Sequence, residues 1–348
     1  MLDKIKRGWR KPGWLNLILL PVSFLYSVVV FVRHALYKLG ILESTSLDKP
    51  VVVVGGISVG GVGKTPVVVE LIRHFRGKGF RPGVISRGYG GDSDHWPRKV
   101  DENTNPALVG DEPQLIFEQT GAPVVVGPDR VADGRFLINK LGCDVLISDD
   151  GFQHFRLRRD IDIVVVDSQF DSAGLGNLWC LPAGPMREPV NNLGRADLVV
   201  INGVSENCTE HSQLMVAGVN RYRMSMKLKQ VRSLKTGEVR LLESFSDSPV
   251  FAVAGLGNPE RFFLGLERAG LSIIRKPFPD HHRFVESDIP VEIFRGNIRP
   301  VLMTEKDAIK CRTFDNLDNL WVVPGHGIIE RKFYDQLDRL MEKITTND

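Results

Sequence analysis

Short apolar runs, separated by polar segments that contain glycine, dominate the first part of this 348-residue chain. The run Val51–Val54 is β-branched and uninterrupted, which is typical of a strand buried on both faces. Residues 64–77 and 131–141 instead carry apolar side chains at helical spacing. Further strand-like runs are found at 82–86, 123–126, 145–147, 162–167 and 196–202. Because strands alternate with helices, we predict an α/β fold with a doubly wound, mostly parallel sheet that binds ligands at the carboxyl ends of its strands.

Between about residues 219 and 245 the pattern changes to alternation of apolar and polar residues. Tyr222, Met224 and Met226 alternate with polar neighbours, which predicts a half-buried strand. The sequence KTGE predicts a turn into a partner strand, VRLL, so we interpret this region as a β-hairpin connector. Beyond it, VFAVAGLGNPERF and two later apolar runs predict a second, smaller α/β lobe, in which GLG is interpreted as a turn.

The N-terminus carries an apolar stretch, residues 14–32, between basic residues on both sides. A helix of this length would extend about 28 Å, which is borderline for the ~30 Å hydrocarbon core of a membrane. Its polar residues recur every seven or four positions and form one narrow stripe: Asn16, Ser23, Ser27, His34 and Lys38. The basic flanks are formed by Lys4, Lys6, Arg7, Arg10 and Lys11 before the stretch and Arg33 after it. This pattern favours a helix that lies in the membrane interface over one that spans the membrane, and a soluble core helix is the least favoured alternative.

Charge and cysteine content narrow the class of protein. The net charge is only +3, so we expect no nucleic-acid partner. The cysteines are scattered and form no CxxC pair, which argues against a zinc site or a disulfide scaffold and favours a reducing cytosol: Cys143, Cys180, Cys208 and Cys311. No obligate protein partner is inferred from the sequence.

The segment SVGGVGKTP follows the first strand and precedes the first helix, which predicts a P-loop NTPase-like core. Its glycines allow successive backbone N–H groups to converge on phosphate oxygens at the start of the helix. Lys64 can reach the β- and γ-phosphates of ATP, and the Thr65 hydroxyl can bind Mg²⁺. Ser58 stands where the usual pattern has glycine, a departure that affects only the first position of the loop. The predicted ATP-binding residues are Ser58, Val59, Gly60, Gly61, Val62, Gly63, Lys64 and Thr65.

A second buried strand, 145–147, ends at Asp149 and Asp150. A carboxylate at that position can hold Mg²⁺ directly or through water; the alternative is an acidic turn capped by Gly151.

Taken together, these patterns divide the chain into four parts. We expect a membrane-associated helix (1–40), a P-loop ATP-binding core (41–215), the hairpin connector (216–248) and the smaller α/β lobe (249–348).

Two polar clusters in the second half admit several interpretations. In PDHH (Asp280, His281, His282), adjacent histidines in an extended segment point to opposite sides, which favours one orienting histidine over a metal pair. The alternative is a turn-capping aspartate with surface histidines. TEKD (304–307) is similar to a base-recognition motif of GTP-binding proteins, with Thr in place of the leading Asn. Recognition of the nucleotide base is the less favoured interpretation of this segment.

Together these segments resemble the tetraacyldisaccharide 4'-kinases of lipid A biosynthesis in Gram-negative bacteria. The resemblance covers nearly the whole chain and includes SVGGVGKTP, SRGYG, VGDEP, DDGFQH, LPAGPMREP, PDHH and TEKDA. It implies transfer of a phosphoryl group from ATP·Mg²⁺ to the 4'-hydroxyl of an acylated disaccharide 1-phosphate. It also implies a location at the cytoplasmic face of the bacterial inner membrane.

The resemblance assigns roles to individual residues. Asp111 is implied as the general base and His281 as the residue that orients it, with a helix cap as the alternative for Asp111. Glu112 is implied in the Mg²⁺ shell beside Thr65, Asp149 and Asp150. Arg87, Arg187 and His154 are candidates for contacting the lipid substrate, and a structural salt bridge is the alternative for each arginine.

The rival function is a membrane-associated P-loop ATPase switch. Many such switches carry a second lysine in the loop, and this chain has Val59 there, which weighs against the switch. A structural membrane scaffold with a relic loop is also disfavoured, because Lys64, Thr65 and the Asp149–Asp150 pair are all intact.

Overall fold

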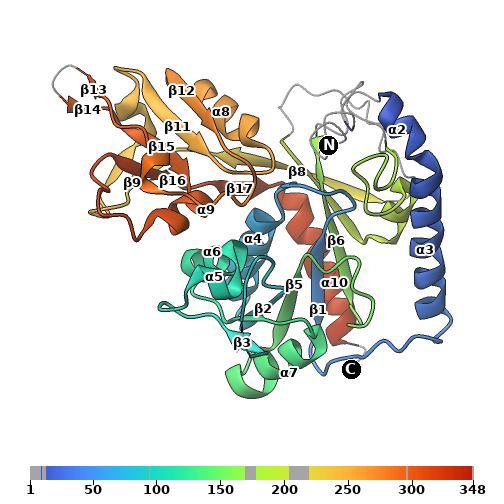
Figure 1. Ribbon diagram of the computed structural model, residues 1–348. Coiled ribbons are helices and arrows are strands. Elements are labelled where there is room, and N and C mark those ends of the chain that lie inside the picture. Colours follow the sequence, from blue (N-terminus) through green and yellow to red (C-terminus); the bar gives the residue numbers. More distant parts are fainter. Residues whose placement is uncertain are drawn as a thin grey trace.

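The computed structural model describes residue 9 and residues 13–93, 95–168, 178–203, 219–294 and 297–346. Within these ranges the chain forms two lobes, each organised around one large β-sheet (Figure 1). Several residues discussed above lie outside the described ranges, as does the predicted boundary at residue 215: Lys4, Lys6, Arg7, Arg10, Lys11 and Cys208.

The large lobe has a sheet that, in the described residues, contains nine strands. Neighbouring strands are parallel except at the edges, where β3 pairs antiparallel with β4 and β17 with β8. The predicted doubly wound, mostly parallel sheet is therefore confirmed. In spatial order the strands are β17 (His326–Ile329), β8 (Asn220–Lys227), β7 (Leu198–Asn202), β6 (Ile161–Asp167), β1 (Val51–Gly55), β5 (Val145–Asp149), β2 (Pro82–Ser86), β4 (Val124–Val126) and β3 (Arg98–Lys99).

Two apolar cores cover opposite faces of this sheet, and the central strand β1 contributes to both. Val52 and Val54 face the core that holds helices α4 (Lys64–Gly77), α6 (Asp111–Thr120) and α10 (Arg331–Thr345). Val51 and Val53 face the core that holds α7 (Arg130–Leu141). These valines are at most 1% exposed. Burial of one such side chain stabilises the fold by roughly 1.5–3 kcal/mol, which explains why the uninterrupted run forms the centre of the sheet.

The smaller lobe has a second sheet, six-stranded in the described residues. Helix α8 (Pro259–Arg268) covers one face, and α9 (Glu305–Ala308) with the 3₁₀ helix η5 (Ile309–Cys311) covers the other. In spatial order the strands are β10 (Val239–Leu241), β9 (Gln230–Ser233), β16 (Leu320–Val323), β15 (Val301–Thr304), β11 (Val250–Ala254) and β12 (Ile273–Pro277).

The residues predicted to form one hairpin connector are divided between the two sheets. Strand β8 pairs with β7 and β17 in the large sheet, whereas the hairpin around KTGE is formed by β9 and β10 in the small sheet. Tyr222 and Met224 of β8 are buried in the core of the large lobe, which explains why the alternating strand joins that sheet. Residues 228–229 are the link between the lobes.

The end of the chain returns to the large lobe. Strand β17 completes the large sheet, and Phe333 and Leu337 of α10 are fully buried against its core. The smaller lobe, predicted to extend over 249–348, therefore ends near Pro324. Among the described residues the chain passes between the lobes at 228–229 and again at 324–325.

The N-terminal segment forms helices α2 (Trp14–Ile18) and α3 (Leu20–Lys38), which lie along the large lobe at the right of Figure 1. Helix α3 is long and apolar enough to cross a membrane, but one such helix near an N-terminus is weak evidence that it does. The predicted polar stripe faces the large lobe over most of its length, since Asn16 and Ser23 are buried and Ser27 and His34 are partly buried, whereas Lys38 at its end is exposed. The opposite face is exposed and apolar, and includes Trp14, Leu17, Ile18, Val22, Phe24, Leu25, Val29 and Phe31.

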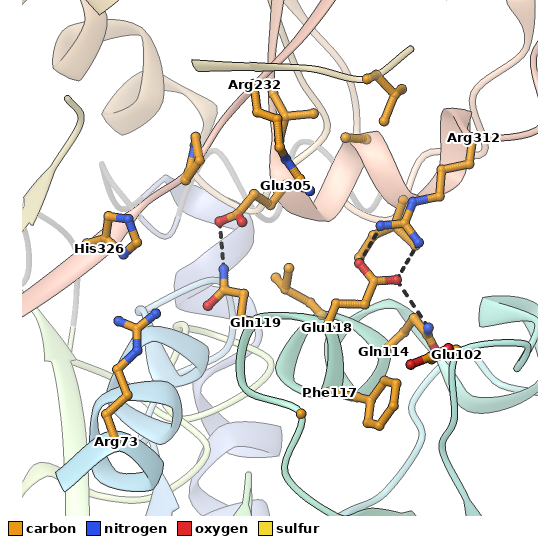
Figure 2. Close-up of a pocket in the computed structure, with 17 residues that line it drawn as sticks. Arg73, Glu102, Gln114, Phe117, Glu118, Gln119, Arg232, Glu305, Arg312 and His326 are labelled. Atoms are coloured by element: carbon orange, nitrogen blue, oxygen red, sulfur yellow. Dashed lines mark hydrogen bonds and ion pairs between the residues drawn. The ribbon is translucent and has the colours of Figure 1, made fainter. Parts of the chain in front are cut away.

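Helix α6 of the large lobe contacts the smaller lobe near both of its ends. At its C-terminal end Gln119 donates a hydrogen bond to Glu305 of the smaller lobe, and Glu118 forms an ion pair with Arg312 (Figure 2). A hollow of about 570 Å³ lies beside these contacts. None of the phosphate-loop residues lines it, so this hollow is separate from the predicted nucleotide site.

Candidate active site

The predicted phosphate loop connects β1 to α4. Gly60 (φ 108°) and Gly63 (φ 96°) adopt backbone conformations that favour glycine. A Cβ on Gly63 would lie 2.1 Å from Nδ2 of Asn202, which donates a hydrogen bond to the carbonyl of Val62 (2.9 Å). Gly63 is also the N-cap of α4 and offers no side chain to cap it. The first N–H groups of this helix are therefore suited to bind phosphate oxygens.

Ser58, which departs from the usual loop pattern, pairs with another loop of the large lobe. It is 2% exposed and forms a β-bridge with Met186. The neighbouring Val59 N–H donates to the carbonyl of Pro185 (2.9 Å). The first position of the loop is thus fixed by a short antiparallel pairing, where other phosphate loops have glycine.

Asp149 and Asp150 lie at the end of β5 and face the phosphate loop. Oδ1 of Asp150 is 3.4 Å from Nζ of Lys64, and both Asp150 oxygens accept from Nη1 of Arg187 at 2.9–3.0 Å. Asp149 is 2% exposed, and its Oδ1 has no hydrogen-bond partner in the described structure. Burial, together with the negative charges of Glu112 and Asp150, raises the pKa of Asp149 to about 7.

The side chains beside the loop fit a Mg²⁺ ion. Thr65, Asp149, Asp150 and Glu112 offer hydroxyl and carboxylate oxygens, the ligands that hard divalent cations prefer. The buried, unpartnered Oδ1 of Asp149 is an acceptor that such a cation would satisfy. Within the described part of the chain, no three His, Cys, Asp or Glu side chains already converge on a metal position. ATP phosphates and water would therefore complete the shell.

We expect binding of ATP with Mg²⁺ near pH 7 to release a proton from Asp149. Its raised pKa keeps the carboxyl largely protonated below pH 7 before ATP and Mg²⁺ bind, whereas binding to a cation requires the ionised form. The number of protons released should rise toward one as the pH falls from 8 to 6. Calorimetry with preformed ATP·Mg²⁺, in buffers of different ionisation enthalpy, measures this number. Equal release by Asp149→Asn would assign the proton to another group.

Asp111, the predicted base, begins α6 and contacts the smaller lobe. Its Oδ2 lies 3.5 Å from Nδ1 of His281 and 3.2 Å from Nζ of Lys310. His281 has a φ of 58°, which is uncommon for a residue other than glycine, and its ring packs near Tyr89 (5.6 Å between centroids). Burial alone would raise the pKa of Asp111, but His281 and Lys310 together outweigh it and lower that pKa. The carboxylate therefore stays ionised and able to accept a proton.

Two lysines of the smaller lobe were missed by the sequence analysis. Lys306 lies 3.0 Å from Oε1 of Glu112 and 3.6 Å from Oδ1 of Asp280, and Lys310 lies beside Asp111. Both follow strand β15, four residues apart, a spacing that places them on one side of a helical turn. Lysines at this spacing after a strand end were the signal available in the sequence.

The TEKD motif holds part of the site together rather than contacting a base. Asp307 is fully buried and accepts hydrogen bonds from the Gly255 N–H (3.0 Å) and the Thr304 hydroxyl (2.8 Å). Its carboxylate is therefore not open to a nucleotide base. The GLG turn that it holds touches the phosphate loop, since a Cβ on Gly257 would lie 2.8 Å from the nitrogen of Gly61.

The residues predicted to contact the lipid occupy different environments. Arg87 is exposed, whereas the guanidinium of Arg187 is engaged with Asp150, as in the structural alternative for that residue. His154 is half-buried, its Nε2 has no partner in the described structure, and burial lowers its pKa to about 4.

Sequence analysis missed the buried Arg130, which directs Nη2 toward the carbonyl of Asp149 (3.5 Å). Its signal was the segment GPDR after β4.

The side chains of His281 and His282 contact different parts of the structure. His281 approaches Asp111, whereas His282 bonds to Asp288 (2.9 Å) and stacks on Phe278 within the smaller lobe. The left-handed conformation of His281 turns the two rings in different directions. The arrangement supports one histidine directed at the site and does not bring the two together as metal ligands.

The family model described as tetraacyldisaccharide-1-P 4'-kinase matches residues 15–342 of this chain. A tetraacyldisaccharide 4'-kinase from Hahella chejuensis is 41% identical, over 100% of this chain and 99% of its own length. A relative of the same name from Haemophilus influenzae is 42% identical, over 96% of this chain and 97% of its own length.

A solved structure agrees with these sequence relatives. It is the crystal structure of the "apo" form of LpxK from Aquifex aeolicus in complex with ATP, and it matches with a TM-score of 0.76 at 29% identity. The match covers 94% of this chain and 99% of that one. With a family match across most of its length and full-length relatives above 40% identity, the chain belongs to the tetraacyldisaccharide-1-P 4'-kinase family.

Proposed function

We propose that this chain transfers the γ-phosphate of ATP to the 4'-hydroxyl of a tetraacyldisaccharide 1-phosphate. The observation that carries the proposal is the approach of Asp111 and His281, from different lobes, beside the phosphate loop and its acidic cluster. A sugar hydroxyl is a poor nucleophile and needs a base within hydrogen-bond reach. The names of the relatives and the ATP complex of the structural neighbour support this pair of substrates.

Each group in the site has a role in this reaction. The loop N–H groups and Lys64 hold the β- and γ-phosphates, while Thr65, Asp149, Asp150 and Glu112 are suited to hold Mg²⁺. Held by these side chains, Mg²⁺ would supply positive charge that offsets the negative charge developing during phosphoryl transfer. Asp111 accepts the proton of the sugar hydroxyl. His281 orients the Asp111 carboxylate through the oxygen that it contacts.

Movement of the smaller lobe is part of the proposal. Gly257 lies against Gly61, so the GLG turn occupies space beside N–H groups that the ATP phosphates require. The lobe must therefore shift when ATP binds and close again to bring His281 to Asp111. Catalysis would then depend on lobe closure, as in other enzymes that assemble their site from two lobes.

The test is transfer of labelled phosphate from ATP into a tetraacyldisaccharide 1-phosphate, followed by mass analysis of the product. We expect ATP consumption to require the acylated sugar and the label to be found at the 4' position. ATP hydrolysis that proceeds equally without the acceptor would favour the membrane-associated ATPase switch instead.

We also propose that the enzyme works at the cytoplasmic face of the bacterial inner membrane, with the outer face of α2 and α3 in the lipid interface. That face is apolar and exposed, whereas most of the polar stripe is covered by the large lobe. A single helix whose polar side already contacts protein is suited to lie against a membrane rather than to cross it alone. The lipid substrate enters from the same surface.

We expect Leu25→Ser to weaken binding to vesicles of anionic and zwitterionic phospholipid by roughly tenfold, the effect of removing one leucine from lipid. The matched control is Leu241→Ser on the smaller lobe, because Leu25 and Leu241 are 63% and 60% exposed. Vesicle flotation measures both variants. Equal loss in both would contradict a specific membrane face, and labelling that places Met1 across the bilayer would replace it with a spanning helix.

A further inference from the structure

A loop of the large lobe, residues 180–188 and here called the strap, lies between the phosphate loop and the N-terminal helices α2 and α3. Three helix side chains donate hydrogen bonds to backbone carbonyls of the strap: Asn16 Nδ2 to Ala183 (3.0 Å), Ser23 Oγ to Cys180 (2.6 Å) and Tyr26 Oη to Arg187 (2.9 Å). Asn16 is 1% and Ser23 is 4% exposed. The bonds of Asn16 and Ser23 are buried and that of Tyr26 is partly buried, and each fixes the main chain of the strap rather than a flexible side chain.

The other side of the strap holds the nucleotide site. The N–H of Arg187 donates to the carbonyl of Ile57 (2.7 Å), and Pro185 accepts from Val59 (2.9 Å). These two bonds enclose Ser58, the position at which the loop departs from its usual glycine. The strap therefore fixes the start of the phosphate loop.

Arg187 links both sides of the strap. Its carbonyl accepts from Tyr26, its N–H binds the phosphate loop, and its guanidinium binds both oxygens of Asp150. Asp150 has a φ of 50°, a left-handed conformation that is strained for aspartate. Such a conformation persists only when surrounding contacts hold it, and Arg187 provides two of these contacts.

We infer that Asn16, Ser23 and Tyr26 are positioning residues for the ATP site, which act through the strap on the phosphate loop and on Asp150. The two faces of the N-terminal helix then have separate tasks. The inner face supports nucleotide binding, and the outer face contacts lipid. The inference rests on the proposed function only for the identity of the nucleotide.

The test measures the dissociation constant of ATP·Mg²⁺ for full-length Tyr26→Phe, without lipid acceptor. One lost hydrogen bond should weaken binding about fivefold, and the Ser23→Ala/Tyr26→Phe double variant should weaken it further. The matched control is Tyr334→Phe. Tyr334 is also a partly buried tyrosine of the large lobe, but it belongs to α10, which packs on the face of the sheet opposite to the strap. We expect the control to bind ATP·Mg²⁺ like the wild type, and vesicle binding to be unchanged in Tyr26→Phe.

A thermodynamic cycle with Arg187→Ala tests the path. If Tyr26 acts on Asp150 through the guanidinium of Arg187, adding Tyr26→Phe to Arg187→Ala should cost little more than Arg187→Ala alone. Full additivity would overturn the path through Asp150. Unchanged affinity in Ser23→Ala/Tyr26→Phe, or the same loss in Tyr334→Phe, would overturn the inference as a whole. Because the readout is nucleotide binding, a protein that binds ATP as described but does not phosphorylate the lipid refutes the proposed function and leaves this inference standing.

Discussion

Replacement of Asp111 by Asn is expected to lower kcat by about a hundredfold to ten-thousandfold, the usual contribution of a general base. The substitution keeps the shape of the side chain and removes its ability to take the proton of the acceptor hydroxyl. ATP affinity should remain close to that of the wild type, because the phosphate loop and Lys64 hold the phosphates. Steady-state kinetics together with equilibrium ATP binding separates the two effects.

His281 provides the internal control for that assignment. His281→Ala should cost less than Asp111→Asn, since it removes the residue that orients the carboxylate and not the base itself. Combining both substitutions should lower kcat little beyond Asp111→Asn alone, because residues that act as one unit are strongly non-additive. If the two losses multiply in full, the residues act independently. A ligand-bound structure with Asp111 far from the γ-phosphate would refute the base assignment, and Asp149 would be the next residue to test.

Replacement of Lys64 by Ala is expected to lower turnover by several orders of magnitude. The ammonium group stabilises charge on the transferring phosphoryl group, and losing one such contact in a water-poor site costs far more than in solution. Thr65→Ala should have a comparable effect through lost Mg²⁺ placement. Near-normal kinase activity in a folded Lys64→Ala protein would refute the assignment of the loop.

The Lys64 variant should remain folded, which keeps this result interpretable. Lys64 contacts Asp150 at 3.4 Å, but Arg187 also contacts Asp150 at 2.9 Å and would still compensate its charge. We therefore expect the melting temperature of Lys64→Ala, measured without nucleotide, to change by only a few degrees. A collapse of the fold would mean that the lysine has a structural role as well.

The parts of the fold that depend on local pattern were predictable. The uninterrupted valines of β1 and the apolar spacing of α4 identified both elements, and α4 spans Lys64–Gly77 as predicted. Strand β8 was recognised as a half-buried strand, but its partner was not. The partner is chosen by the burial of Tyr222 and Met224 in the large core, which depends on residues far away in sequence.

In the candidate site, too, local motifs were predictable from the sequence, whereas contacts between distant segments were not. The phosphate loop and the Asp149–Asp150 pair follow directly from sequence, because their chemistry depends on a short contiguous motif. The lysines beside Asp111 and Glu112 could not be identified in that way, since they reach the site only when the smaller lobe folds against α6. The polar stripe of the N-terminal helix was recognised as a stripe, but its partner, the strap, begins more than 140 residues later.

The two passages of the chain between the lobes leave the large sheet at the same place. Lys227, the last residue of β8, pairs directly with His326, the first residue of β17. The smaller lobe is thus inserted between β8 and β17, two adjacent antiparallel strands of the large sheet. Both of its covalent links to the large lobe therefore lie side by side at one edge of the smaller lobe. Such an attachment permits rotation about the line through the two links and resists twisting and sliding. His281 would therefore return to Asp111 along the same arc in every catalytic cycle, and substitutions at residues 228–229 or 324–325 would change the rate of opening without changing the place of closure.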